Sequence, residues 1–131
     1  MLTVEQLTAS MPFAETCGVV ITSAAPEEVR AVMDWDKSRC TVGGVLHGGA
    51  LITLADSAGA VCAFLNLPEG ATGTSTIETK TNLFRAVREG RVEAVSTPLH
   101  VGRTTIVVET DLWDAAGKRV ARTTQTQSVL S

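Results

Sequence analysis

The sequence has few of the residues on which several common functions depend. Its 131 residues contain no tyrosine, two tryptophans and three phenylalanines, too few for a platform on which nucleic acid bases stack. The net charge of -3 provides no global positive field that would attract nucleic acid or an anionic membrane. We therefore expect neither nucleic acid nor a membrane as a partner.

Cysteine and histidine are equally scarce. Cys17, Cys40 and Cys62 are odd in number and lack metal-binding spacing, which predicts buried, reduced thiols in a cytoplasmic protein. His47 and His100 are the only histidines, and no cluster of acidic residues joins them, so a zinc site is not expected. The serine-hydrolase elbow, the P-loop and the dinucleotide fingerprint are also absent, and we expect no metal and no cofactor.

Long apolar runs are missing as well. No stretch approaches the roughly 20 uninterrupted apolar residues of a membrane span. The first residues, MLTVEQLTASM, include Glu5 and no basic flank before an apolar run, unlike a signal peptide. With 44% hydrophobic and 19% charged residues, the chain predicts one soluble domain, residues 1–131, built around a single core.

The residues that are present predict one long helix between two groups of strands. A short helix capped by Thr3 or Thr8 comes first, and Pro12 limits it. Two strands follow, and Pro98 marks an edge position or a bulge in one of the four later strands. The expected strands cover residues 18–22, 29–35, 74–87, 91–102, 103–113 and 118–130. This order predicts an α+β fold in which the helix lies across a curved antiparallel sheet of about six strands.

The long helix ends at Leu65 and has two distinct faces. Large apolar residues recur at helical spacing and indicate a buried face; they are Leu51, Leu54, Val61 and Leu65. Small and polar residues recur on a second face, where a ligand could lie; they are Gly49, Thr53, Asp56 and Ala60. Asp56 is the only ionisable residue between His47 and Glu69, so it has no local ion-pair partner.

The sequence His47-Gly48-Gly49, with Asp56 on the following helix, resembles the PaaI-type and 4-hydroxybenzoyl-CoA-type acyl-CoA thioesterases. Their pattern has Asn or Gln six residues before HGG, and Asp or Glu seven after its last glycine. Two further blocks follow in the family's order, TIETKTNLFRAV at 76–87 and HVGRTTIVVET at 100–110. One departure is Thr41, which stands where the family has Asn or Gln.

The resemblance implies the hotdog fold and hydrolysis of an acyl-CoA thioester. The Gly48 N–H would polarise the thioester carbonyl. Asp56 would act either as nucleophile or as general base, and the sequence does not decide between these two roles. His47 would help to orient the thioester, and Thr76 would hold a water molecule. Thr41 could position carbonyl or water through its hydroxyl but offers no amide donor.

Each of these residues also has a simpler interpretation. Gly48 and Gly49 fit a tight junction between loop and helix, and His47 fits a helix cap. Thr76 fits an ordinary strand position. Asp56 fits a solvated helix face, although it lacks a cation three or four residues away.

The spacing of Gly48 and Asp56 has a consequence for assembly. Eight residues separate them, which is about 12 Å along a helix at ~1.5 Å per residue. This is too far for both to contact one thioester carbonyl, so one site needs two helices. The resemblance implies antiparallel helices across a two-fold axis, in a homodimer or a dimer of dimers with sites at the subunit interface.

The phosphates of coenzyme A need cations, and guanidinium groups suit them. Arg85, within NLFRA, and Arg103, beside Thr104 within HVGRT, are the preferred coenzyme A contacts. Arg88 and Arg91 lie nearby in the sequence. The alternative for each arginine is a solvated loop charge.

The sequence thus predicts an acyl-CoA thioesterase. A hotdog dehydratase acting on hydroxyacyl thioesters is the alternative enzyme, although His47 lies in the wrong block to form its proton-transfer pair with a carboxylate. A non-catalytic acyl-CoA-binding protein is the third possibility. The identity of the acyl chain cannot be read from the sequence.

Overall fold

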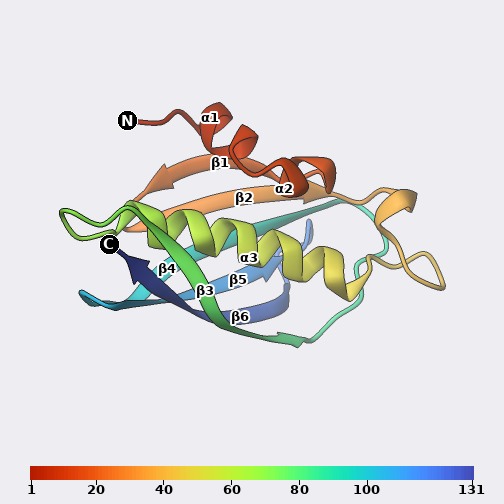
Figure 1. Cartoon of the computed structure of the whole chain (residues 1–131). Helices are drawn as coiled ribbons and strands as arrows, with labels where there is room; N and C mark the ends of the chain where they lie inside the picture. The colour runs from red at the N-terminus through yellow and green to blue at the C-terminus, as the bar shows by residue number, and fades with distance from the viewer.

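The computed structural model describes all of residues 1–131 and shows one long helix held by a curled antiparallel sheet (Figure 1). The helices are α1 (Val4–Ala9), α2 (Pro12–Thr16) and α3 (Gly48–Leu65), with a 3-10 turn at Lys37–Arg39. The strands are β1 (Val20–Ala25), β2 (Glu28–Asp34), β3 (Gly73–Leu83), β4 (Arg91–Val101), β5 (Thr105–Trp113) and β6 (Arg119–Leu130). They form one six-stranded sheet in the order β1-β2-β4-β5-β6-β3, which confirms the predicted α+β architecture.

Helix α3 lies on the inner face of the sheet and fills the core. Leu51, Leu54, Val61 and Cys62 are buried, as the helical spacing predicts, while Leu65 is only partly buried. Although α3 has the length and hydropathy of a membrane span, half of its residues are buried within the chain. Its apolar composition therefore reflects its place in the core.

The N-terminal segment differs from the prediction. Thr3 caps α1, and its side chain accepts a hydrogen bond from the Gln6 N–H. Pro12 does not end the helical segment but begins a second helix, α2. Proline suits this first helical position because the N–H that it lacks has no partner within the helix. Figure 1 shows α1 and α2 beside β1 and α3, so the missed helix borders the face of α3 that carries Asp56.

The strand after α3 is shorter than predicted. It ends at Leu83 instead of Val87 because the N–H groups of Phe84 and Arg85 both donate to the Val120 carbonyl, which interrupts the regular ladder. The chain then turns inward, Val87 is buried, and its carbonyl accepts a hydrogen bond from the Leu46 N–H. This turn places residues 84–87 against the start of α3.

Pro98 marks a bulge and not a sheet edge. Strand β4 is central, between β2 and β5, and its register with β5 shifts between Pro98 and His100. A bulge accommodates a residue that cannot donate to the ladder.

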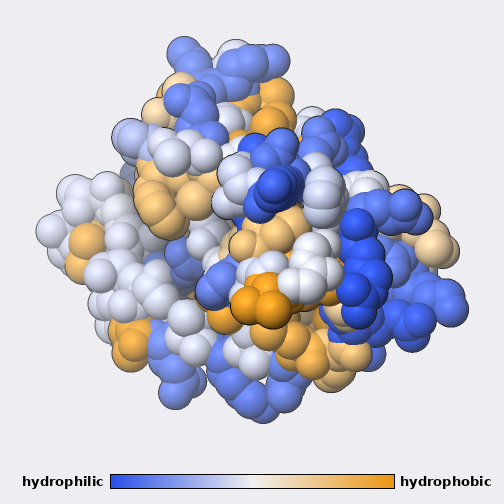
Figure 2. All heavy atoms as spheres, turned by 90° about the vertical axis from the view of Figure 1, so that its right-hand side faces the viewer, coloured by the Kyte–Doolittle hydropathy of each residue, from blue (hydrophilic) through white to orange (hydrophobic).

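The two edges of the sheet differ in their exposure. Strand β1 is covered by α1, whereas β3 pairs only with β6 and is mostly exposed. Figure 2 views the end of the molecule where α3 begins, and apolar atoms there lie beside hydrophilic ones. The exposed apolar residues at this end include Val42, Leu83 and Phe84.

Candidate functional site

The first turn of α3 presents one free hydrogen-bond donor. The first four N–H groups of a helix have no partner within it. Here the Gly49 N–H donates to His47 Nδ1 over 2.8 Å, and the N–H groups of Ala50 and Leu51 donate to the His47 carbonyl. No group of the chain accepts from the Gly48 N–H. This donor lies at the positive end of an 18-residue helix.

His47 is the N-cap of α3. Because Nδ1 accepts the Gly49 N–H, the neutral ring carries its proton on Nε2. His47 lines a hollow of about 600 Å³ together with Gly49, Thr53, Cys17 and Arg39. The capping interpretation is therefore correct, and it leaves the Nε2–H available as a second donor near the start of the helix.

Gly48, Thr41 and Arg85 lie together. They line a hollow of about 370 Å³ between the loop before α3 and the turn after β3. The Thr41 N–H donates to the Val45 carbonyl, which closes a tight turn, and Thr41 is exposed. The structure thus brings three predicted site residues to one end of the molecule. They are Gly48, whose N–H was predicted to bind the thioester carbonyl, the predicted coenzyme A contact Arg85, and Thr41, which replaces the family's Asn or Gln.

Asp56 lies in a different hollow, of about 630 Å³, between α2, α3 and β3. Thr76 and Thr53 line the same hollow, so the structure places the predicted carboxylate beside the predicted water-binding hydroxyl. The lining is otherwise mostly apolar and includes Met11 and Phe13 from the N-terminal segment. Asp56 is the only ionisable residue in this lining.

The environment of Asp56 changes its acidity. Burial raises the pKa of this carboxyl above its ordinary value, and a hydrogen bond from Gln125 partly opposes the rise. No charged neighbour contributes to the shift. A carboxylate with a raised pKa is a stronger base, so burial makes Asp56 more basic than an exposed aspartate.

Two glutamines on β6 were not predicted as site residues. Gln125 Nε2 donates to Asp56 Oδ1 over 3.4 Å, and Gln127 Nε2 donates to Thr76 Oγ1 over 2.8 Å. Both side chains are buried. The sequence carries no signal for them because they lie in a run of alternating polar residues.

The two halves of the predicted site are separate within one chain. Gly48 and Asp56 line different hollows, as expected for residues about 12 Å apart along one helix. The carboxylate and the donor therefore do not form a single site in the isolated chain.

The two preferred arginines also lie apart. Arg85 follows β3, whose residue Leu83 pairs with Ala121, whereas Arg103 and Thr104 precede Thr105, which pairs with Ser128. Seven residues of strand at about 3.3 Å each separate these positions by roughly 23 Å. Neither arginine takes part in a salt bridge. One chain cannot hold the same phosphate with both.

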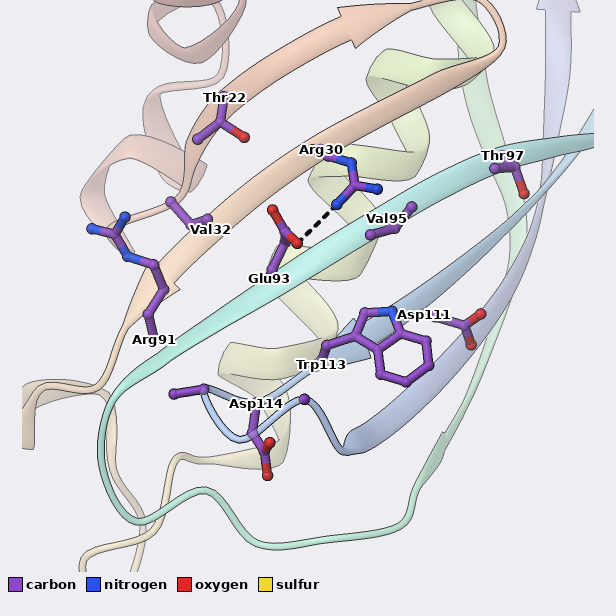
Figure 3. A pocket seen from close by; sticks show the side chains of 12 residues that line it. Thr22, Arg30, Val32, Arg91, Glu93, Val95, Thr97, Asp111, Trp113 and Asp114 are labelled. Atoms are coloured by element: carbon purple, nitrogen blue, oxygen red, sulfur yellow. Dashed lines mark hydrogen bonds and ion pairs between the residues drawn. The ribbon is translucent and has the colours of Figure 1, made fainter.

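A larger hollow of about 880 Å³ lies on the outer face of the sheet, away from α3 (Figure 3). Most of its charged groups pair with one another or with neighbouring residues. Arg30 contacts Glu93 over 3.0 Å, and Arg91 contacts Asp34 over 2.7 Å. Asp111 is paired with Arg122 over 2.8 Å. The remaining charged group of the lining, Asp114, has no ion-pair partner, and its Oδ1 accepts the N–H groups of Ala116 and Lys118 within the hairpin loop. The charged groups of this hollow are therefore engaged in contacts within the chain.

The cysteines are only partly as predicted. All three are free, but Cys17 and Cys40 are partly exposed and only Cys62 is buried. Burial raises the pKa of the Cys62 thiol to about 11, so this residue is a neutral core thiol at physiological pH.

Comparison with known proteins agrees with this geometry. The sequence profile of the thioesterase superfamily matches residues 43–121. The 1,4-dihydroxy-2-naphthoyl-CoA hydrolase of Escherichia coli is 34% identical over 104 residues, which cover 79% of this chain and 76% of that protein. The proofreading thioesterase EntH of Cronobacter sakazakii is 30% identical over 131 residues, covering 98% of this chain and 95% of that one.

Solved structures show the same fold. Thioesterase HI1161 from Haemophilus influenzae superimposes with a TM-score of 0.93 at 28% identity, over 100% of this chain and 92% of that one. A mutant of the phenylacetic acid degradation protein PaaI from Thermus thermophilus gives 0.83 at 28% identity, over 92% of this chain and 100% of that one. The fold is the hotdog fold of thioester hydrolases, as the resemblance implies. The chain belongs to the thioesterase superfamily.

Proposed function

We propose that the protein hydrolyses an acyl-CoA thioester to a carboxylic acid and coenzyme A. The observation that carries this proposal is the Asp56 carboxylate, which has no ion-pair partner and lies in a mostly apolar hollow beside Thr76, on the same helix as the free Gly48 N–H. A carboxylate and a polarising donor are the two groups that thioester hydrolysis needs. The E. coli relative is named as a CoA hydrolase, which favours a coenzyme A thioester.

The site is completed by a second copy of the chain. A two-fold axis near Ile52, midway between Gly48 and Asp56 in the first half of α3, brings Gly48 of the partner subunit to Asp56. The exposed edge of β3 offers unpaired backbone groups for this association. The same axis carries the partner's Arg85 toward the end of the sheet that holds Arg103. The two arginines that lie apart in one chain then serve one coenzyme A.

In this arrangement the Gly48 N–H of the partner subunit binds the carbonyl oxygen. As general base, Asp56 takes a proton from water, and the resulting hydroxide attacks the carbonyl carbon. The donor stabilises the oxyanion. When the intermediate collapses, the carbon–sulfur bond breaks and the thiolate leaves, to be protonated by Asp56. As nucleophile, Asp56 instead attacks the same carbon, the carbon–sulfur bond breaks, and the thiolate leaves and takes a proton from water. The anhydride that remains on Asp56 is then cleaved by water, which releases the acid and restores the carboxylate.

Product analysis tests this function. The purified protein is incubated with a panel of aliphatic and aromatic acyl-CoA thioesters, and free thiol is measured with a thiol reagent. Hydrolysis releases thiol and free acid, and turnover of at least one thioester in the panel is expected. Formation of an enoyl thioester without thiol would show a dehydratase. Ligand that binds and is recovered unchanged would show a binding protein.

The structure provides no observation in favour of the dehydratase. That reaction needs a histidine and a carboxylate acting together as a proton-transfer pair. In this chain His47 Nδ1, the nitrogen that would accept a proton in the neutral ring, instead accepts the Gly49 N–H as a helix cap.

Replacing Arg85 or Arg103 with alanine is expected to raise KM for acyl-CoA several-fold while leaving kcat almost unchanged. A contact to a remote phosphate contributes equally to binding of the ground state and of the transition state. Steady-state kinetics of the two variants with acyl-CoA measure the effect. Because neither arginine has an ion-pair partner to lose, both variants should fold normally.

Two controls accompany these variants. Acyl-pantetheine thioesters lack the nucleotide phosphates, so both variants should hydrolyse them like the wild type. Arg91→Ala removes an arginine that is already paired with Asp34 and should leave KM unchanged. Equal losses on acyl-CoA and on acyl-pantetheine would show that Arg85 and Arg103 do not bind phosphate.

A further inference from the structure

The inner face of β6 carries two buried glutamines behind the candidate site. Gln125 is 1% exposed and Gln127 is 1% exposed, and each directs an amide N–H to one site residue. Thr123, two residues earlier on the same face, instead pairs with Thr81 through hydroxyl groups 2.7 Å apart. The contacts to Asp56 and Thr76 are therefore specific to the two glutamines and are not a general property of the strand.

The fold accommodates Gln125 at a cost. Its Oε1 is buried and has no hydrogen-bond partner, and a buried polar atom without a partner is destabilising. The amide also packs against Gly59 in the middle of α3, where any Cβ would collide with Gln125 Oε1. Glycine is a poor residue for a helix interior. A smaller apolar residue at position 125 would avoid both costs, so core packing does not explain the glutamine.

The directions of the two amide groups explain why glutamine is present at position 125. The Gln125 amide donates a hydrogen bond to Asp56 Oδ1. No group of the chain donates to Asp56 Oδ2, which remains available to the substrate or to water. Gln127 donates to Thr76 Oγ1, so the threonine hydroxyl retains its own proton as a donor.

We propose that Gln125 and Gln127 are positioning residues that hold Asp56 and Thr76 from behind, with the Asp56 Oδ2 and the Thr76 hydroxyl proton directed to the reacting water. The proposal builds on the proposed thioesterase function, and Gly59 belongs to it because only glycine leaves room for the Gln125 amide. Neither glutamine touches the thioester itself.

The electrostatic surroundings make the role of Gln125 measurable. Its hydrogen bond lowers the pKa of Asp56 against the effect of burial. Charged residues on the neighbouring elements do not line the hollow; they are Glu15 on α2, Glu78 and Lys80 on β3, and Arg119 and Arg122 on β6. The two arginines contact acidic residues of β5. Removing the Gln125 amide should therefore raise the pKa of Asp56 with no charged neighbour to compensate.

Gln125→Met tests the proposal, because methionine has a similar length and no hydrogen-bonding amide. We expect kcat to fall by about 10-fold to 100-fold, as for a reacting group that is slightly misplaced, with little change in KM. The acidic limb of the pH profile of kcat/KM should move to higher pH. The melting temperature should stay the same or rise, because the unpartnered oxygen is removed. If Gln125 served only the fold, the substitution would instead lower the melting temperature and leave the acidic limb of the pH profile unchanged.

Two further variants separate the roles. Gln127→Met should lower kcat without moving the acidic limb, since Thr76 does not titrate. Thr123→Val removes a partly buried hydrogen bond on the same strand and face and should change neither kcat nor the acidic limb of the pH profile. A folded Gln125→Met variant with the kcat and acidic limb of the wild type would overturn the proposal. So would a loss of activity in Thr123→Val equal to that in Gln125→Met.

A measurement that does not depend on activity distinguishes this proposal from the proposed function. The ¹³C chemical shift of the Asp56 carboxyl, followed by NMR against pH, reports its pKa directly in the wild type and in Gln125→Met. A higher pKa in the variant supports the positioning role even if no thioester in the panel is hydrolysed. An identical pKa in both proteins overturns it, even if the wild type is an active thioesterase.

Discussion

Replacing Asp56 with asparagine is expected to lower kcat by about a hundred-fold to ten-thousand-fold, the range that a positioned general base contributes. The amide has the volume of the carboxyl but can neither attack the thioester nor accept a proton from water. Thiol release under saturating acyl-CoA measures the effect. A folded asparagine variant with nearly wild-type turnover would exclude Asp56 as the reacting group.

The same substitution should not destabilise the fold. Burial raises the pKa of Asp56 in the folded state, so the ionised carboxyl is less favourable in the folded chain than in the unfolded chain. Its contribution to stability is therefore largest when the group is protonated and is lost as the pH rises through the raised pKa. At neutral pH the neutral asparagine should keep or raise the melting temperature, which separates loss of chemistry from loss of structure.

Mixing Asp56→Asn with Gly48→Pro is expected to restore activity that neither variant has alone. Each heterodimer contains one site with both wild-type groups and one with neither. Random reassortment into two-fold dimers gives about half heterodimers, and hence about a quarter of the wild-type activity per chain. The measurement is thiol release by co-expressed, purified heterodimers, in which one site of two is intact and which should have about half of the wild-type activity per chain. An inactive heterodimer of two folded variants would show that the carboxylate and the donor do not act across an interface.

The local structure favours this choice of variants. Proline is tolerated at the first helical position, and His47 before it has φ -60° and ψ 136°, a conformation compatible with a following proline. Gly48→Ala is the matched control. Its Cβ meets the flexible end of Leu83, 3.0 Å away, as a proline ring would, but it keeps the N–H. Gly48→Ala alone should therefore remain far more active than Gly48→Pro.

The sequence predicted the parts of the fold in which each residue type has one clear role. The spacing of Leu51, Leu54 and Val61, for example, identified the buried face of α3. The missed helix α2 shows the opposite case, because Pro12 fits both the end of one helix and the start of the next. Only the packing of this segment against α3 decides between them.

The candidate site was predicted to a similar extent. Gly48, His47, Asp56 and Thr76 could be named because they stand in a recognisable order. The supporting glutamine Gln125 could not, because the middle of β6, residues 122–128, reads Arg-Thr-Thr-Gln-Thr-Gln-Ser and has no apolar residue to mark which face is turned inward. Without that mark the register of a strand is undefined, and the glutamines look like solvent-exposed residues.

The separation of Arg85 from Arg103 was equally hidden. Both lie next to a strand and both carry a guanidinium suited to phosphate, but the strand order that places them at opposite ends of β6 is a property of the whole sheet. Sequence spacing contains no information on it.

The spacing of eight positions between Gly48 and Asp56 on α3 also makes the specific activity depend on the protein concentration. A single dissociated chain has one carboxylate and one donor, but in the proposed arrangement it contains no complete site and is inactive. Specific activity should then decline on dilution below the dissociation constant of the dimer, following mass action. At protein concentrations below this constant, most chains would be monomers and would not hydrolyse thioesters. The spacing of two residues on one helix thus sets the protein concentration at which the reaction begins.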